Sequence, residues 1–367
     1  MKKFSDAITV VAFFAIIIMF AVSTLFFQGN VSFDDLAKNS ITTKEACSEY
    51  VVQNFPMNSN WRSMFTNLMV FAGRKRFGDT FVTDDRLVKL SDFHGVDHTI
   101  ENVAYINELA ANTDSPIYMM LAPTAGGVYS ADIPDLFGSG GQRERINEAY
   151  MQLDKRIISI DAFYPLYSAR DEYVYYRTED LWTSFGAYYA YTESVGQLGF
   201  SSVNLDNYDQ EYADANFTGS LYNKAMVGSI EPDRIRIFRS KYQSPVTKVE
   251  MFGASDEREA ESVYFRSALK SAKKTDIFLL GNKYFKTDIY TDIKDGPRLL
   301  MIKGSFANTI APFYTAHYSK ITMVDPNKLK QADMKLLDVV DPDDYDQILV
   351  IFDIDSFSRA AFFDVLT

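Results

Sequence analysis

A serine stands in a turn of small residues, in the segment Lys303-Gly-Ser-Phe-Ala-Asn308. The apolar run before it, 298–303, predicts a strand, and the residues after it predict a helix. A serine held at such a turn exposes its hydroxyl, and the N-terminus of the following helix favours developing negative charge. Ser305 is therefore a candidate nucleophile. The alternative is that its hydroxyl is an ordinary helix N-cap.

Two other segments place polar groups beside apolar elements. Gly281 and Asn282 directly follow the apolar run 277–280. The acidic pair Glu179-Asp180 precedes residues that predict an aromatic helix. In open parallel sheets, ligands bind at the carboxyl ends of the strands, where strand meets helix. We therefore expect these segments to lie near Ser305.

Strands and helices alternate along the chain. This alternation predicts an α/β protein with a mostly parallel sheet, because unbroken apolar strands are typical of sheets that are buried on both faces. The more polar region 201–275 is interpreted as an insertion or an edge subdomain. The predicted strands are 116–122, 157–160, 298–303, 321–324 and 347–352, and the predicted helices are 49–73, 100–111, 142–155 and 305–318.

The N-terminal segment predicts a single membrane anchor at 7–27. A helix rises about 1.5 Å per residue, so a run of about twenty apolar residues covers a hydrocarbon core of about 30 Å. Lys2 and Lys3 precede the run and Asp34 follows it, which predicts a cytoplasmic tail at 1–6 and an extracytoplasmic remainder. A cleaved signal peptide is the alternative, although signal h-regions are shorter. The polar segment 28–49 is interpreted as a stalk and 50–367 as the exported domain.

The composition excludes several classes of protein. A hydrophobic content of 47% supplies ample core material, so a disordered chain is excluded. The net charge of −12 argues against a nucleic-acid partner. Three histidines and one cysteine are too few for a structural zinc site, so we predict no metal and no cofactor.

The order of several short motifs resembles that of the DHHW-type proteins. That family belongs with the SGNH hydrolase superfamily and is similar to alginate O-acetyltransferase-like proteins. The resemblance implies a flavodoxin-like three-layer α/β/α domain. The motifs are Gln53-Asn-Phe-Pro56 with Trp61, Met120–Ala125, Tyr176–Tyr191, Thr218–Tyr222, Pro232-Asp233, Gly281-Asn282, Ser305–Asn308, Pro312-Phe313 and His317-Tyr318.

The resemblance implies serine acyl transfer. In that mechanism a serine attacks an acetyl ester, a histidine takes its proton, and an aspartate two residues earlier orients the histidine. The nucleophile position is Ser305, and the oxyanion positions are Gly281, Asn282 and the Ser305 amide. The carboxylate position is Glu179.

The signature Asp-His-His-Trp falls on Glu179-Asp180-Leu181-Trp182, so leucine stands at the base position. Leucine cannot accept a proton, and loss of one triad member costs on the order of 10⁴–10⁶ in rate. Asp180 is a weak alternative base. His94 and His98 are loop candidates for a substitute, whereas His317, on the helix predicted at 305–318, would lie ~18 Å along its axis from Ser305.

Two functions follow from these residues. The first is a catalytically degenerate binding or accessory module in O-acetylation of a surface polysaccharide or cell-wall glycan, working beside a membrane-bound acyltransferase. The second is an active serine O-acetyltransferase or acetylesterase with a rearranged base. Trp182, Tyr188 and Phe306 are candidate glycan-binding residues; the alternative is that these aromatic side chains form core. An open polar cleft at Ser305 would favour testing for activity, and a cleft filled by Leu181 would favour binding elsewhere.

Overall fold

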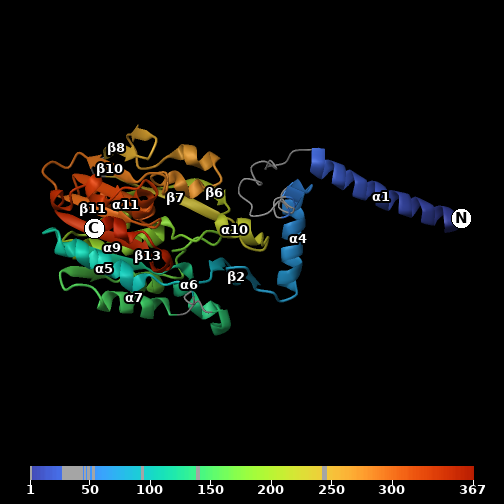
Figure 1. Cartoon of the computed structure of the whole chain (residues 1–367), viewed down its shortest axis with the longest axis horizontal. Helices are drawn as coiled ribbons and strands as arrows, with labels where there is room; N and C mark the ends of the chain where they lie inside the picture. The colour runs from blue at the N-terminus through green and yellow to red at the C-terminus, as the bar shows by residue number, and fades with distance from the viewer. Residues whose placement is uncertain are drawn as a thin grey trace. The chain divides into compact units, whose positions relative to one another are not determined.

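The computed structural model describes residues 2–26, 44, 47, 50–51, 54–91, 95–137, 141–241 and 246–367 (Figure 1). The chain divides into two compact units. One contains residues 1–74 with 225–229, and the other contains residues 75–224 with 230–367. Residues 50–74 therefore group with the N-terminal unit and not with the rest of the predicted 50–367 domain. Most of the predicted stalk, 28–49, lies outside the described residues.

The N-terminal unit contains two main helices, α1 (Lys2–Phe26) and α4 (Asn58–Phe71). α4 is shorter than the predicted helix 49–73, because Met57 before it has a left-handed backbone, with φ of 57°. Side chains of α1 are described over 9–24 only. Among the described residues, no helix combines the length and the apolarity that are needed to cross a membrane.

A large sheet forms the centre of the other unit. Among the described residues its strand order is β5-β4-β13-β11-β12-β10-β8-β9. Neighbours from β5 to β12 pair in parallel, whereas β10, β8 and β9 join antiparallel. The bounds are β4 Ile117–Ala122, β5 Ile157–Ile160, β8 Val246–Phe252, β9 Glu257–Ala260, β10 Lys286–Thr291, β11 Arg298–Lys303, β12 Lys320–Val324 and β13 Gln347–Asp353.

These bounds confirm the predicted strands, and among the described residues four of the seven neighbouring strand pairs are parallel, so the sheet is mostly parallel with an antiparallel edge. In chain order, the parallel strands lie as 2-1-5-3-4, whereas the flavodoxin-like order is 2-1-3-4-5. The order of the parallel strands therefore differs from the flavodoxin-like one. The C-terminal strand β13 occupies the centre, and its residues from Ile348 to Asp353 are all buried. Such an apolar strand is stabilised most where both of its faces are covered.

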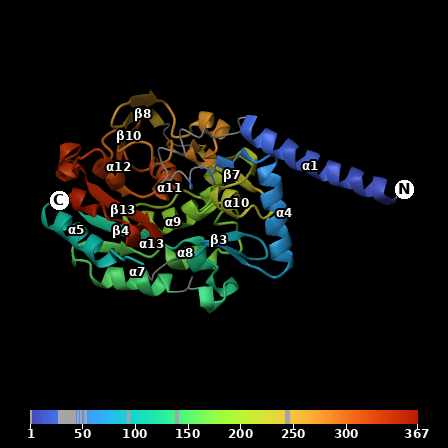
Figure 2. The ribbon, with the colours of Figure 1, turned by 45° about the vertical axis from the view of Figure 1, so that its right-hand side comes forward.

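Helices cover both faces of the sheet, as the three-layer prediction requires. Along β11, Leu299 and Met301 face one hydrophobic core, and Leu300 and Ile302 face the other. The first core includes residues of α8 (Phe163–Ser168), α9 (Ser184–Gln197) and α11 (Ala307–Tyr314). The second includes α5 (Thr99–Ala111), α7 (Gln142–Met151), α12 (Pro326–Gln331) and α13 (Ile354–Arg359) (Figure 2).

Two small sheets and some short helices complete the C-terminal unit. β1 (Arg76–Phe77), β2 (Thr80–Val82) and β3 (Leu87–Lys89) form an antiparallel sheet. β6 (Tyr208–Phe217) pairs with β7 (Asp233–Ser240). The region 201–275 thus contributes this separate pair and the antiparallel edge strands β8 and β9. The short helices are α6 (Ala125–Val128) and α10 (Ser220–Ala225), the last residue of which belongs to the other unit.

Candidate serine site

Ser305 lies in the turn between β11 and α11. Strand β11 ends at Lys303 and the helix begins at Ala307, so the serine stands just before the first helical turn. The helix is shorter than the predicted 305–318. Ser305 is half-buried, and none of the described residues accepts a hydrogen bond from its hydroxyl or its backbone N–H. The hydroxyl therefore does not cap the helix and is free to react with a ligand.

Glycine is required immediately before the serine. A Cβ at Gly304 would lie 2.7 Å from the Cδ1 atom of Phe352, a side chain of the central strand β13. The aromatic ring therefore leaves no room for a side chain at this position. The turn keeps its shape through close packing with β13.

A buried lysine organises the polar groups beside Ser305. The Lys303 ammonium donates to Oδ1 of Asn282 at 2.8 Å, to Oδ1 of Asn308 at 3.0 Å and to the Gly281 carbonyl at 3.3 Å. Its side chain is 3% exposed and lies 3.8 Å from Asp325. Burial lowers the pKa of Lys303, and Asp325 opposes that shift.

This network orients the amide of Asn282. An ammonium group only donates, so the oxygen of Asn282 must face Lys303. The same oxygen accepts from Nδ2 of Asn308 at 2.9 Å, and Asn308 also donates to the Ser305 carbonyl. The Nδ2 atom of Asn282 therefore points away from the lysine, and none of the described residues accepts from it. It is a preorganised donor for an oxyanion.

Gly281 departs from its predicted role. The run 277–280 is not a strand, because Leu279 and Leu280 both have left-handed backbones. In the resulting turn the N–H of Gly281 donates to the Phe278 carbonyl at 3.0 Å. The prediction that this N–H binds an oxyanion is wrong for the present structure. Gly281 has a φ of +63°, and a Cβ there would clash with the carboxylate of Asp276, so glycine serves the turn itself.

Glu179 is anchored by a contact with the loop at Ser220. Its carboxylate accepts from the N–H of Asp180 at 2.9 Å, from the N–H of Ser220 at 2.8 Å and from the Ser220 hydroxyl. A carboxylate with these donors is anchored. Glu179 occupies the position of the carboxylate that would orient a histidine, but leucine stands at 181 in place of that histidine.

Asp180 forms an ion pair that the sequence did not predict. Its carboxylate lies 2.7 Å from the ammonium of Lys89 at the end of β3. Burial raises the pKa of Asp180 to about 7, and Asp353 and Asp355 add to that effect, while Lys89 opposes it. Burial also opposes the charge of Lys89, but Asp180 outweighs it and raises the pKa of the lysine.

The predicted groups line one cavity of about 380 Å³. Leu181 is half-buried and packs partly against the core, so it forms wall and does not fill the space. Because the cleft at Ser305 is open and Leu181 does not fill it, activity is worth testing. The polar residues of the lining are Lys89, Glu179, Asp180, Ser220, Lys273, Thr275, Asp276, Asn282, Ser305, Asn308, Thr309, Asp353 and Ser356.

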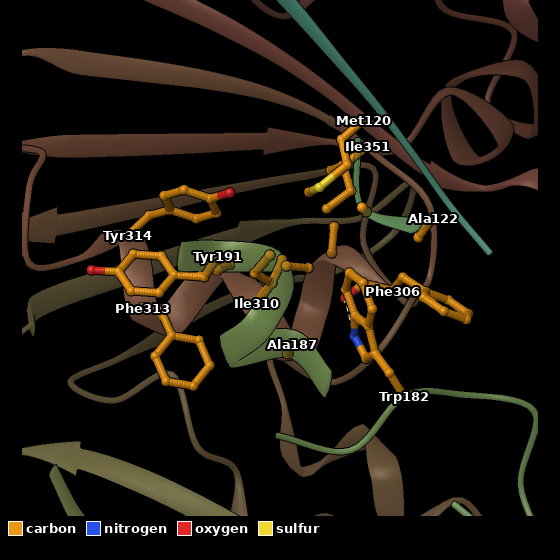
Figure 3. Close-up of a cluster of buried hydrophobic side chains, with 14 of the residues drawn as sticks. Met120, Ala122, Trp182, Ala187, Tyr191, Phe306, Ile310, Phe313, Tyr314 and Ile351 are labelled. Atoms are coloured by element: carbon orange, nitrogen blue, oxygen red, sulfur yellow. Dashed lines mark hydrogen bonds between the residues drawn. The ribbon is translucent and has the colours of Figure 1, made fainter. Parts of the chain in front are cut away.

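Trp182 and Phe306 belong to the core. Trp182 is 0% exposed and Phe306 is 2% exposed, their ring centroids are 4.7 Å apart, and the indole N–H donates to the Phe306 carbonyl (Figure 3). The prediction that they bind glycan is wrong, because neither face is accessible. Tyr188 also packs against this core and donates to the Val203 carbonyl.

The described histidines do not replace the missing base. His317 pairs with the hydroxyl of Tyr191 at 2.7 Å, and burial lowers its pKa to about 4. His98 lies 2.8 Å from Glu101. Neither lines the cavity of Ser305. His94 lies outside the described residues.

Sequence reasoning missed Lys303, Asn308, Lys89 and Asp353. Lys303 had a signal, because a lysine that ends an apolar strand directly before a small-residue turn is unusual unless it is paired. Lys89 had none, because β3 is far from the site in sequence. Asp353 follows the last strand and caps α13 through the N–H of Ser356, which a strand-to-helix rule would have flagged.

The fold and this site define an α/β protein with a serine at a strand-to-helix turn and a preorganised asparagine beside it. The chain belongs to the DHHW protein family, whose model matches residues 30–324. No curated protein shows a significant sequence match to it.

The first two of three similar solved structures agree with this fold. A DHHW family protein from Eubacterium siraeum is 21% identical, with a TM-score of 0.65, and the match covers 79% of this chain and 97% of that one. PatB1 of Bacillus cereus, solved with a sulfonyl adduct, is 13% identical, with a TM-score of 0.65, and the match covers 78% of this chain and 98% of that one. The O-acetyltransferase domain of Pseudomonas putida AlgJ is 13% identical, with a TM-score of 0.46, over 80% of this chain and 96% of that one.

Proposed function

We propose that this protein is an accessory module of surface-glycan O-acetylation that binds an acylated glycan at Ser305 without turning it over. One observation carries the proposal. The serine and a preorganised Asn282 amide line an open polar cavity, while the base position in the same cavity is Leu181. The substrate class comes from the resemblance of the family to alginate O-acetyltransferase-like proteins.

The geometry supports binding in preference to catalysis. An ester carbonyl is an acceptor, and the Ser305 N–H and Nδ2 of Asn282 are two donors that bind no acceptor among the described residues. The described lining of the cavity, however, has no histidine to remove the proton of the serine; its titratable residues are carboxylates and lysines. An unassisted hydroxyl is a weak nucleophile at neutral pH. The site therefore has hydrogen-bond donors for a carbonyl oxygen but lacks a histidine for proton transfer.

Acetyl-ester turnover by the full-length protein tests the proposal. We expect no turnover above that of Ser305→Ala, and saturable binding of an acetylated oligosaccharide by the unmodified protein. Turnover that disappears in Ser305→Ala would refute the accessory role. Absence of binding to acetylated oligosaccharides would refute the proposed ligand.

A second function is favoured by the pKa of Asp180. A carboxyl group whose pKa is raised to about 7 is suited to general-base work near neutrality, and Asp180 lines the same cavity as Ser305. An acetyltransferase or acetylesterase that uses Asp180 as its base would show turnover that rises through pH 7. Asp180→Asn would abolish that turnover, whereas it would leave glycan binding by an accessory module in place.

We also propose that the N-terminal segment anchors the protein in the cell membrane, with the bulk of the chain outside. The anchored protein then acts beside a membrane-bound acyltransferase. The charge-free run from Ala7 to Ser32, with Lys2 and Lys3 before it, supports the anchor. Carbonate extraction of membranes tests it. We expect the full-length protein in the membrane fraction and a variant without residues 1–27 in the soluble fraction; a soluble full-length protein would refute the anchor.

Co-purification with a membrane acyltransferase tests the partner. Absence of an acyltransferase from the protein purified in mild detergent would refute this partner.

A further inference from the structure

A second cavity, separate from that of Ser305, is lined by arginines and aromatic rings. It has a volume of about 260 Å³. Its walls come from β7, from β6 and from the start of α9. The residues that line it are Tyr173, Arg177, Thr183, Ser184, Phe185, Tyr212, Glu231, Arg234 and Arg236.

The strand pattern of β7 places two of the arginines on one face. Arg234 and Arg236 are two residues apart, so both side chains leave the same side of the strand. Between and beyond them, Ile235 and Ile237 are 0% exposed and enter the core. The core therefore fixes the strand, and the strand fixes the spacing of the two guanidinium groups.

Aromatic rings hold these guanidinium groups in place. Arg236 is opposite Tyr212 in the β6–β7 register, and its Cζ lies 4.4 Å from that ring and 4.8 Å from the ring of Phe185. It donates to Oε1 of Gln210 at 2.8 Å and to the Tyr212 hydroxyl. Stacked guanidinium groups lose little conformational freedom when they bind a ligand.

The charges of the cavity are not balanced. Among the described residues, neither Arg234 nor Arg236 forms an ion pair with a carboxylate. Arg177 has only Glu231, at 3.8 Å, and the Glu231 side chain is 82% exposed. The arginines lower the pKa of Tyr212, first through a hydrogen bond from Arg234 and then through the charge of Arg236. A concentration of positive charge in a chain with a net charge of −12 calls for an anionic ligand.

We propose that this cavity binds an anionic sugar, with the arginines on its carboxylate or phosphate group and the ring of Tyr212 against its apolar face. Guanidinium groups bind both kinds of anion through paired, charge-assisted hydrogen bonds. Tyr212 is 49% exposed and so presents a ring to the ligand. The choice of a sugar rests on the proposed function, whereas recognition of the anion rests on the arginines alone. Arg177 directly precedes the Thr178–Leu181 segment that reaches the Ser305 cavity, so one chain segment contributes to both sites.

Calorimetric titration of the full-length protein tests this site, with trigalacturonic acid, glucose 1-phosphate and neutral maltotriose as probes. We expect at least one anionic probe to bind at least about tenfold more tightly than maltotriose, and Arg234→Gln to remove that preference. Arg239→Gln is the matched control, because Arg239 lies on the same strand but does not line the cavity. It should leave the affinity within about twofold.

Each outcome decides the proposal. Preference for the uronide identifies a carboxylated glycan, and preference for the sugar phosphate identifies a phosphorylated one. Equal binding of all three probes, no binding of either anion, or equal losses in Arg234→Gln and Arg239→Gln would each overturn it. Inorganic phosphate separates this proposal from the proposed function. If phosphate binds and Arg234→Gln weakens phosphate binding while no sugar binds, the arginines bind an anion. The sugar as ligand and the glycan function are then both refuted. Ser305→Ala should bind the anionic probes normally.

Discussion

The two halves of the Ser305 cavity differ in how their residues are held. One half contains Ser305 and Asn308 from the β11–α11 segment and Asn282 from the turn before β10, joined through the buried ammonium of Lys303. The opposite half, 179–182, has an anchored Glu179 and a buried Trp182 with Leu181 between them. Both halves are therefore held by buried or anchored groups, and Leu181 stands at the position where the resemblance places the base. The comparison shows that a buried ammonium organises one half, whereas an anchored carboxylate and a buried indole organise the other.

The largest effect on stability is expected from Trp182→Ala, which tests whether the half at 179–182 stabilises the fold. Removing a fully buried indole and its hydrogen bond to the Phe306 carbonyl should lower the free energy of unfolding by about 3–5 kcal/mol. Urea denaturation measures it. Trp61→Ala is the matched control, because that indole is 45% exposed. A loss below about 1 kcal/mol for Trp182→Ala would show that the ring is not core.

Lys303→Met tests the nucleophile half. It leaves the oxygens of Asn282 and Asn308 and the carboxylate of Asp325 without their cationic partner, which should cost about 3 kcal/mol. Denaturation again provides the measurement, with Lys283→Met as the control because Lys283 is exposed and pairs only at the surface with Asp256 and Tyr284. Equal stability of the two variants would contradict a structural role for the ammonium.

Restoring the base should rescue catalysis. Leu181→His, together with Glu179→Asp, is expected to raise acetyl-ester turnover at least about 100-fold, or about 2.7 kcal/mol in activation free energy. Leu181→Asn in the same background supplies a polar side chain of similar size without a base and should not gain activity. Equal turnover in the histidine and asparagine variants would show that the missing base is not what limits the site.

The smallest effect concerns pH. The pKa of Asp180 is about 7 in the folded protein and has an ordinary value of 3.8, so the folded state binds more protons between these values. This group therefore makes folding less favourable as pH rises, with a slope of at most about 1.4 kcal/mol per pH unit near pH 5.5. Asp180→Asn should remove that part of the slope, measured as the difference between the two denaturation profiles. Parallel profiles would contradict the raised pKa.

The sequence indicated the elements more reliably than their arrangement. The strands at 298–303 and 157–160 match because unbroken apolar runs depend on local pattern. The central place of β13 and the antiparallel addition of β8–β10 depend on pairing across the chain, which periodicity does not encode. The run 277–280 is as apolar as a strand, yet Leu279 and Leu280 turn with positive φ. Tertiary contacts decide such cases.

The same limit applies to the site. The order of motifs placed Ser305, Asn282 and 179–181 together, and all of them line one cavity, although only Ser305 follows a strand of the large sheet. It did not reveal that Gly281 uses its N–H in a turn, or that Trp182 and Phe306 are buried. It also missed the Lys89–Asp180 pair and the Lys303 network, which depend on long-range packing. Residue type alone does not tell which polar groups will be buried together.

Fluorophosphonate labelling of the unmodified full-length protein tests the central claim most directly. A reagent of this kind reports whether the Ser305 hydroxyl is activated, without any assumption about the natural substrate. The account predicts no labelling above that of Ser305→Ala at neutral pH, and labelling in the variant with Leu181→His and Glu179→Asp. Labelling of the unmodified protein that is lost in Ser305→Ala would contradict the account and would point to Asp180 as a working base.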